Sequence, residues 1–232
     1  MGQPDGRRML DGSVLTIRQH PVGPFQANAY LVWDDTAAGE AVLVDAGAEA
    51  ERLLGDLEDH GRTLSAILQT HAHGDHIAAL PEIVAATGAP VYLHPDARGM
   101  LTSAEENLSA YAGTPVTASV ETIPIADGDD LFLLGRTVHV YHTPGHAPGS
   151  VCFHFVDDGV VFTGDALFRG SIGRTDFPGG SFETLIAGIR AKLLVLPDET
   201  RVYAGHMEPT TTGRERRMNP FLQDRASGGV VR

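Results

Sequence analysis

The segment THAHGDH, residues 70–76, places His71, His73, Asp75 and His76 within six consecutive positions. Alternate residues of an extended backbone point to the same side, so His71 and His73 can reach one ion. Gly74 permits a turn that directs Asp75 and His76 toward a different point. Imidazole nitrogens and carboxylate oxygens are ligands for zinc, iron or manganese. Because an apolar run leads directly into this segment, it predicts a metal site rather than a histidine-rich surface loop.

Three further segments show a common arrangement, in which a strand-like run ends in glycine and a ligand-type residue follows. They are TPGHAPGS with His146, FTGDALF with Asp165 and YAGHMEP with His206. Glycine before the ligand allows the backbone to turn tightly at the end of a strand. The candidate metal ligands are therefore His71, His73, Asp75, His76, His146, Asp165 and His206. This set is too large for one tetrahedral ion and suits two ions about 3.5 to 4 Å apart that share a carboxylate.

The elements that must position these ligands are short apolar and β-branched runs, which predict strands, separated by a few amphipathic segments. Strands are expected over residues 13–23, 27–35, 41–47, 64–70, 91–95, 121–125, 131–135, 137–145, 150–156, 159–165 and 200–206. Helices are expected over 48–61, 77–88 and 181–196, with a mixture of helix and loop over 96–120. Strands precede helices in two halves of similar size, which indicates an α/β fold of two packed sheets with helices outside.

Length and composition indicate a folded globular protein. The chain has 232 residues, of which 42% are hydrophobic and 20% charged, close to ordinary globular usage. Residues 1–12 are expected to form a flexible N-terminal extension, and 13–232 a single domain. Cys152 is the one cysteine, so no disulfide can form within the chain.

The charge balance excludes some classes of partner. Acidic residues outnumber basic ones by 30 to 17, which gives a net charge of −13. This charge disfavours a nucleic-acid partner and an anionic membrane surface. No apolar run is long enough to span a bilayer, and the first residues lack the apolar stretch of a secretory signal, so a cytoplasmic protein is expected. The sequence gives no indication of the oligomeric state.

At the candidate ligands the chain resembles the metallo-β-lactamase superfamily. THAHGDH fits the H-x-H-x-D-H signature of that family, and the Gly-His, Gly-Asp and Gly-His elements follow in the same order. The resemblance extends from about Leu15 to Leu222. It implies a four-layer αββα sandwich with the metal ions in a cleft at one edge.

The resemblance also implies a role for each ligand. His71, His73 and His146 would bind one metal ion. Asp75, His76 and His206 would bind the other, with Asp165 as the bridge. Asp45 closes the run AVLVDAG and looks like the carboxylate that orients a ligand histidine.

Other motifs are similar to those of one branch of the superfamily. Asp165 stands where a cysteine would be, and His rather than Arg follows Asp75, which separates the chain from the zinc β-lactamases. GPFQANAYLV, FRGSIGRTDFPGG and ERRMNPFL resemble glyoxalase II-like thioester hydrolases, in a short form without the C-terminal helical domain. The resemblance implies two divalent ions, with zinc favoured over iron or manganese, and a bridging hydroxide that attacks a small-molecule acyl thioester. Asp75 would orient the proton of that nucleophile.

Two alternatives remain. A persulfide dioxygenase would share the GRTDF element and use a single iron held by two histidines and a carboxylate. Ser171-Ile172 precedes this element where a cysteine is expected, and GHMEPTTTG looks more like the hydrolases. A metal-binding protein without catalytic activity is disfavoured because the full ligand set is present.

Three arginines are candidate substrate contacts. Arg174 either holds an anionic part of the substrate or forms a buried ion pair with Asp176, and the ion pair is the preferred interpretation. Arg216 and Arg217 precede NPFL, near the point where the long-form glyoxalases continue into a domain with basic glutathione contacts. They are interpreted equally well as a remnant of such contacts or as a solvated basic patch.

Overall fold

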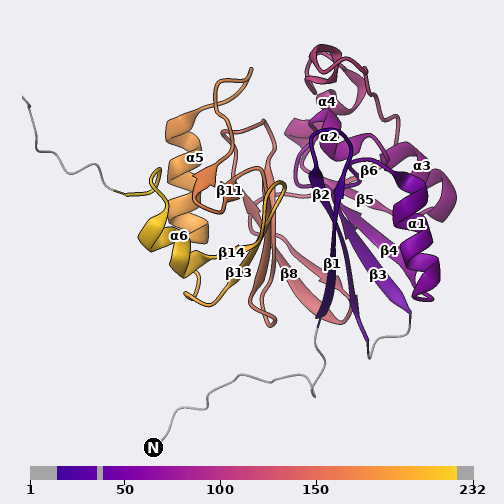
Figure 1. Cartoon of the computed structure of the whole chain (residues 1–232), viewed down its shortest axis with the longest axis horizontal. Helices are drawn as coiled ribbons and strands as arrows, with labels where there is room; N and C mark the ends of the chain where they lie inside the picture. The colour runs from indigo at the N-terminus through magenta and orange to yellow at the C-terminus, as the bar shows by residue number, and fades with distance from the viewer. Residues whose placement is uncertain (1–14, 36–38, 224–232) are drawn as a thin grey trace, which may run out of the picture.

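The computed structural model describes residues 15–35 and 39–223. The predicted N-terminal extension over 1–12 lies outside these ranges. Within them, two six-stranded sheets pack face to face with helices on both outer sides (Figure 1). The αββα sandwich expected from the sequence is therefore confirmed.

The first sheet has the order β1-β2-β3-β4-β5-β6. Its strands are β1 (Leu15–Val22), β2 (Ala27–Asp34), β3 (Glu40–Val44), β4 (Thr63–Leu68), β5 (Val91–Leu93) and β6 (Thr122–Pro124). Antiparallel pairing joins β1, β2 and β3, and parallel pairing joins β3 through to β6. The parallel connections carry α1 (Ala50–Asp59), α2 (Gly74–Ile77), α3 (Leu80–Thr87) and α4 (Arg98–Thr102), with short 3₁₀ turns over Pro95–Ala97 and Ser109–Tyr111.

The second sheet has the order β14-β13-β10-β9-β8-β7. Its strands are β7 (Asp130–Leu133), β8 (Arg136–His142), β9 (Val151–Phe155), β10 (Val160–Gly164), β13 (Arg201–Ala204) and β14 (Thr210–Thr211). A separate ribbon pairs β11 (Leu167–Phe168) with β12 (Ser171–Ile172), and α5 (Phe182–Gly188) and α6 (Thr212–Met218) cover the outer face.

Three layers of apolar side chains hold the sandwich together. Tyr30, Phe153 and Phe162 are among the residues buried between the two sheets. Leu53 of α1 packs in a cluster on the outer face of the first sheet, and Leu185 of α5 in a cluster on the second. Every residue of β2 is buried, as expected for a strand covered on both faces.

Parallel pairing brings the candidate ligands to one edge of the sandwich. The chain leaves β3 at Asp45 and leaves β4 toward His71, and these two strands run parallel. In the second sheet β10 and β13 also run parallel, and they lead to Asp165 and His206. Strands that run parallel end at the same edge, so residues distant in sequence meet there.

The short elements α2, β11, β12 and β14 were not expected from the sequence, and three of the longer helical segments also differ from the expectations. The predicted helix over 181–196 is α5 followed by a π-helical turn over Ile189–Leu193, and its apolar spacing remains buried through both. The predicted helix over 77–88 begins only at Leu80, because Ile77 belongs to α2. Helix α6 was not expected, because its buried face is formed by Thr212, Gly213 and Glu215 rather than by an apolar stripe.

Among the helices of the described segments, none is long and apolar enough to cross a membrane.

A buried ion-pair group joins the two sheets away from the ligand edge. Nη1 of Arg136, at the start of β8, lies 2.6 Å from Oδ2 of Asp34 at the end of β2. Both side chains are 4% exposed. Nε of Arg136 also lies 2.9 Å from the Asp158 carboxylate in the β9–β10 turn. One guanidinium therefore connects both sheets.

We expect Asp34→Ala to lower the free energy of unfolding by roughly 3 kcal/mol, because it removes one partner of a buried charge. The loss lies at the low end of the usual range because Asp158 still pairs with Arg136. Urea unfolding of the metal-free protein measures it. Arg52→Ala is the matched control, since the Arg52–Glu49 pair is exposed and should contribute less than about 1 kcal/mol. Equal losses in the two variants would contradict the assigned role of Arg136.

Candidate metal centre

His71, His73 and His146 form the first group of candidate ligands. One ring nitrogen of each lies within 4.8 Å of the others. Nδ1 of His73 and Nε2 of His146 are 2.9 Å apart, and all three side chains are buried. These two nitrogens are close enough to share a proton in a hydrogen bond or to bind one cation together. The group therefore has the composition and spacing of one metal site.

Asp75, His76 and His206 form the second group, within the same distance limit of 4.8 Å. Nε2 of His206 lies 3.3 Å from Oδ2 of Asp75, and Nε2 of His76 lies 3.8 Å from the same oxygen. Gly74 begins α2, which turns the chain after His73 and directs Asp75 and His76 away from the first group. A second ion would thus find two imidazoles and one carboxylate.

Asp165 lies between the two groups. Its Oδ1 is 3.5 Å from Nε2 of His76, and its Oδ2 is 3.4 Å from Nε2 of His146. Oδ2 is also 3.5 Å from Nε2 of His206. The carboxylate therefore reaches histidines of both groups, which is the position that a bridging ligand requires.

Asp45 fixes the orientation of one histidine in each group. Nδ1 of His76 lies 3.0 Å from Oδ2 of Asp45, and the Thr70 hydroxyl donates to the same oxygen at 2.8 Å. That hydroxyl lies 3.0 Å from Nδ1 of His71 and accepts a hydrogen bond from it, since the hydroxyl hydrogen is donated to Asp45. Because Nδ1 is the donor in both rings, Nε2 is the atom of His71 and of His76 that can bind a metal ion.

Two supporting contacts were not anticipated from the sequence. Nδ1 of His146 donates to the backbone carbonyl of Arg174 at 2.8 Å, which leaves Nε2 of His146 free. The amide of Asn28 donates to the carbonyls of Ala204 and Met207, at 3.0 and 2.9 Å, and so holds the loop that carries His206. An asparagine inside a strand that is otherwise almost entirely apolar was the available signal for the second contact.

Three buried atoms test whether these residues fit a metal. Nε2 of His71, Nε2 of His76 and Oδ1 of Asp165 have no hydrogen-bond partner among the residues that the structure describes. Buried polar atoms without a partner are costly, and a cation would satisfy all three. The donors are imidazole nitrogens and carboxylate oxygens, which suit zinc, iron and manganese. The residues therefore fit two bound metal ions.

The protonation of the metal-free site follows from burial and nearby carboxylates. Burial alone would lower the pKa of His76, but Asp75, Asp165 and Asp45 raise this pKa to about 10. Burial and the neighbouring His146 lower the pKa of His73 to about 3. Burial opposes the ionisation of Asp75, yet His76 and His206 lower its pKa below the usual value. Without metal, the centre therefore keeps a proton on His76 and holds His73 neutral.

Three predicted substrate contacts occupy different positions. Arg174 does pair with Asp176, at 2.9 and 2.7 Å, but both side chains are 66% exposed, so the expectation of a buried pair was wrong. Arg216 and Arg217 both pair with Asp198, and Arg216 also donates to the carbonyls of Leu194 and Leu196. These contacts fasten α6 to the segment that follows the π-helical turn. A substrate contact by any of the three stays a prediction.

A separate cluster contains His94, Asp96 and His142, whose ligand atoms also lie within 4.8 Å of one another. The imidazoles of His94 and His142 are stacked, with centroids 4.1 Å apart and planes 8° from parallel. Because lone pairs lie in the ring planes, parallel stacked rings do not direct them at a common ion. This group does not have the geometry of a metal site.

We expect the affinity for metal to rise by about tenfold per pH unit between pH 6.5 and 8.5, because metal must displace the proton on His76. The raised pKa of His76 has a linked effect on the metal-free fold. Protonated His76 stabilises that fold fully below about pH 6.5, and this contribution is lost as the pH rises through about 10. Competition titration with a chromophoric chelator measures the affinity at each pH. An affinity that does not change with pH would contradict this protonation state.

Gly205→Ala should reduce metal binding, because a Cβ at this position would lie 2.8 Å from Cε1 of His76 and would also contact Oδ1 of Asp165. Bound metal per chain, measured by elemental analysis after dialysis, should fall below half of the wild-type value. Gly55→Ala in α1 is the control, since nothing lies within 4 Å of its Cβ. Full metal content in Gly205→Ala would show that the site tolerates this displacement.

Comparison with solved structures places the chain among metal-dependent proteins. The structure of BLEG-1, described as a B3 metallo-β-lactamase, has a TM-score of 0.86 and 41% identity, and covers 90% of this chain and 100% of that chain. The structure of TTHA1623 in a di-iron-bound form has a TM-score of 0.78 and 42% identity, and covers 88% of this chain and 100% of that chain. The structure of ETHE1 from Myxococcus xanthus has a TM-score of 0.72 and 30% identity, and covers 88% of this chain and 83% of that chain. The likeness to BLEG-1 does not support the sequence argument that separated this chain from the β-lactamases.

Comparison with curated sequences gives relatives that align with this chain over nearly their whole length. Hydroxyacylglutathione hydrolase GloC of Haemophilus influenzae is 38% identical over 223 residues, covering 91% of this chain and 100% of that protein. Probable metallo-hydrolase YqgX of Bacillus subtilis is 41% identical over 206 residues, covering 88% and 96%. The model of the metallo-β-lactamase superfamily matches residues 22–206. With this match and the two bridged ligand groups, the chain belongs to the metallo-β-lactamase superfamily and is a metal-dependent hydrolase of that family.

Proposed function

We propose that this metal-dependent hydrolase cleaves acyl thioesters of a small thiol, as a hydroxyacylglutathione hydrolase does. The observation that carries the proposal is the pair of complete ligand groups with Asp165 between them. GloC, a hydroxyacylglutathione hydrolase by name, is similar over its whole length. Two adjacent ions can act together on one carbonyl and one water molecule.

The residues that would hold the two ions are those of the two groups. His71, His73 and His146 would bind one ion, and Asp75, His76 and His206 the other. Asp165 would contact both. When bound, the ions would lower the pKa of a water molecule and polarise the thioester carbonyl.

We expect Asp75 to orient the attacking water. Its side chain is 24% exposed, so one carboxylate oxygen can face the open side of the site. Because His76 and His206 lower its pKa, Asp75 is ionised at neutral pH and accepts a hydrogen bond. The leaving thiol has a reference pKa of about 8.5, so it departs as a thiolate without a strong general acid.

Aromatic side chains contact histidines of both ligand groups. The ring of Phe177 lies 5.7 Å from that of His73 and 6.0 Å from that of His146, in edge-to-face contacts. Phe168 lies 6.1 Å from His206 on the other side. Apolar walls strengthen the electrostatic interactions made inside the site. They also give the acyl chain an apolar surface to contact.

The metal identity is part of the proposal. The imidazole and carboxylate donors favour zinc, and they also accept iron or manganese. TTHA1623 was found with two irons, which supports iron as an alternative. The small-molecule thioester belongs to this proposal as the partner, and the cytoplasmic location expected from the sequence stays a prediction.

Two rival activities need the same fold. A persulfide dioxygenase needs a single iron, whereas this chain presents a complete second group of Asp75, His76 and His206. That group favours a dinuclear hydrolase. A β-lactamase activity has support from the likeness to BLEG-1 and differs from the proposal only in the acyl compound that is attacked. Substrate tests must therefore separate the thioester from the lactam.

We expect the metal-loaded protein to release thiol from S-D-lactoylglutathione, and a chelator to abolish this release. His73→Ala removes a ligand of the first group and should lower kcat/KM by roughly 100-fold or more. Thiol release is followed with a disulfide reagent, and metal content is measured for each variant. His139→Ala is the control, because His139 pairs with Asp130 in the β7–β8 hairpin, outside both ligand groups.

Parallel assays decide between the rivals. Hydrolysis of a chromogenic cephalosporin without thioester cleavage would replace the proposal by a β-lactamase. Oxygen uptake with glutathione persulfide and one iron per chain would replace it by a dioxygenase. Metal binding without turnover of any of these compounds would indicate the catalytically silent protein.

A further inference from the structure

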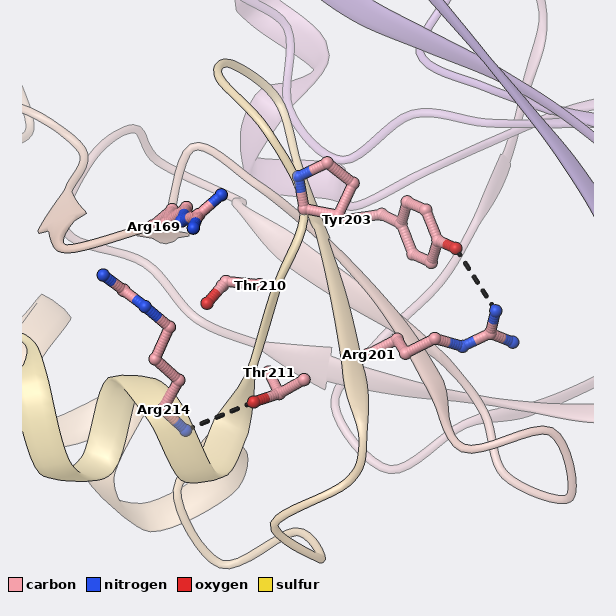
Figure 2. A pocket seen from close by; sticks show the side chains of 7 residues that line it. Arg169, Arg201, Tyr203, Thr210, Thr211 and Arg214 are labelled. Atoms are coloured by element: carbon pink, nitrogen blue, oxygen red, sulfur yellow. Dashed lines mark hydrogen bonds between the residues drawn. The ribbon is translucent and has the colours of Figure 1, made fainter.

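A concave surface with three arginines lies beside the metal centre and was not singled out from the sequence. It has a volume of about 310 Å³ and is lined by Arg169, Arg201, Tyr203, Pro209, Thr210, Thr211 and Arg214 (Figure 2). We call it the arginine pocket. Its volume is at the lower end of that of ligand sites, so it would hold one end of a substrate rather than all of it.

Its position relative to the metal centre follows from the chain. Arg169 comes directly after Phe168, whose ring contacts that of His206. Pro209 is three residues after His206 in the sequence, so their Cα atoms are at most about 11 Å apart. A substrate bound at the metal ions can therefore place its other end in the arginine pocket.

The pocket carries more positive than negative charge. Arg169 pairs with the exposed Glu208 at 2.6 Å, and Arg214 pairs with Glu215, whose side chain is fully buried. Arg201 contacts the hydroxyl of Tyr203 at 3.4 Å and has no carboxylate partner among the residues described. One positive charge is thus left over.

The arrangement of the side chains suits an oxyanion. Figure 2 shows Thr210 near Arg169 and Arg214 on one side of the pocket, while Arg201 extends to the other side toward the Tyr203 hydroxyl. Glu215 does not compete for such a ligand, because it already accepts from Thr210 at 2.6 Å and from the amide of Gly170 at 2.7 Å. Guanidinium groups bind carboxylates and phosphates through paired hydrogen bonds.

A local positive surface would offset the negative net charge of the chain for an anionic substrate. At a net charge of −13, the protein repels an anionic substrate at long range. Glutathione and coenzyme A are both anionic thiols. An enzyme that hydrolyses their esters therefore needs a local positive surface next to the metal ions, and the arginine pocket supplies one.

We propose that the arginine pocket binds the oxyanion of the thiol carrier, a carboxylate or a phosphate, while the acyl group lies at the metal centre. This inference rests on the proposed function, since it names the part of the thioester that selects the carrier. It assigns Arg169, Arg201 and Arg214 to substrate binding and not to the reaction itself.

Steady-state kinetics with three thioesters tests the proposal. S-D-lactoylglutathione carries carboxylates, acetyl-coenzyme A carries phosphates, and S-lactoyl-N-acetylcysteamine is neutral. Arg169→Gln and Arg201→Gln should each raise KM for the anionic ester that the enzyme prefers by about three- to tenfold, with kcat unchanged. KM for the neutral ester should stay the same. The ester whose KM responds identifies the oxyanion as carboxylate or phosphate.

The control variant removes the same charge elsewhere. Arg52→Gln lies on α1, on the outer face of the other sheet, and should leave all three KM values unchanged. An equal rise of KM in Arg52→Gln would show that the loss of one positive charge anywhere explains the effect, and would contradict substrate binding in the arginine pocket. An unchanged KM in the pocket variants, or an equal rise with the neutral ester, would overturn it as well.

A binding experiment separates this inference from the proposed function. S-methylglutathione and S-methyl-coenzyme A have the same anionic groups but no bond to hydrolyse. Calorimetry with the metal-loaded protein should show one of them binding, and three- to tenfold weaker binding in Arg169→Gln. If no thioester is hydrolysed, the proposed function fails. This titration still tests whether the arginine pocket binds an anionic thiol carrier. Binding that is absent, or equal in wild type and variant, would overturn it.

Discussion

The metal centre depends on one buried carboxylate, that of Asp45. It accepts hydrogen bonds from Nδ1 of His76 and from the Thr70 hydroxyl, which in turn accepts one from Nδ1 of His71. These two histidines belong to different ligand groups. Asp45 also accepts from the backbone amide of Thr70 at 2.8 Å. Its backbone is left-handed, with φ of 59°, a conformation that aspartate tolerates better than most residues. Loss of this carboxylate would remove the hydrogen bonds that orient one histidine in each ligand group.

The second requirement is that the two sheets keep a fixed distance, because each supplies part of the site. Asn28 and Tyr30 of β2 both donate to the carbonyl of Ala204, at the end of β13. The Asn28 amide also donates to the carbonyl of Met207, whose backbone is left-handed and whose side chain is 57% exposed. The first sheet thus holds the His206 loop of the second. The side chain of Met207 lies largely in solvent, so this residue contributes to the loop through its backbone.

The sequence was informative where chemistry and backbone conformation coincide. A glycine followed by a ligand at the end of an apolar run predicted where His146, Asp165 and His206 would lie, because parallel strands end at a common edge. Periodicity did not reveal α6, since the side chain at its centre is Glu215, a buried carboxylate held by hydrogen bonds. It also gave no signal for contacts made through backbone atoms. The backbone carbonyl of Arg174 orients His146. The sequence led instead to a prediction for its side chain, a buried ion pair with Asp176, and that ion pair is exposed.

The fold of this chain is similar to that of BLEG-1, described as a B3 metallo-β-lactamase, so the fold alone does not determine the substrate. Both a lactam and a thioester present a carbonyl to two metal ions and differ in what lies beyond it. Selectivity must therefore come from surfaces that contact the remainder of the molecule. In this chain such surfaces are the aromatic border of Phe168 and Phe177 and the cationic side chains on the β11–β12 turn, β13 and α6. An apolar wall and a separate positive pocket suit a substrate with an uncharged acyl end and an anionic carrier, which is the form of a glutathione or coenzyme A thioester.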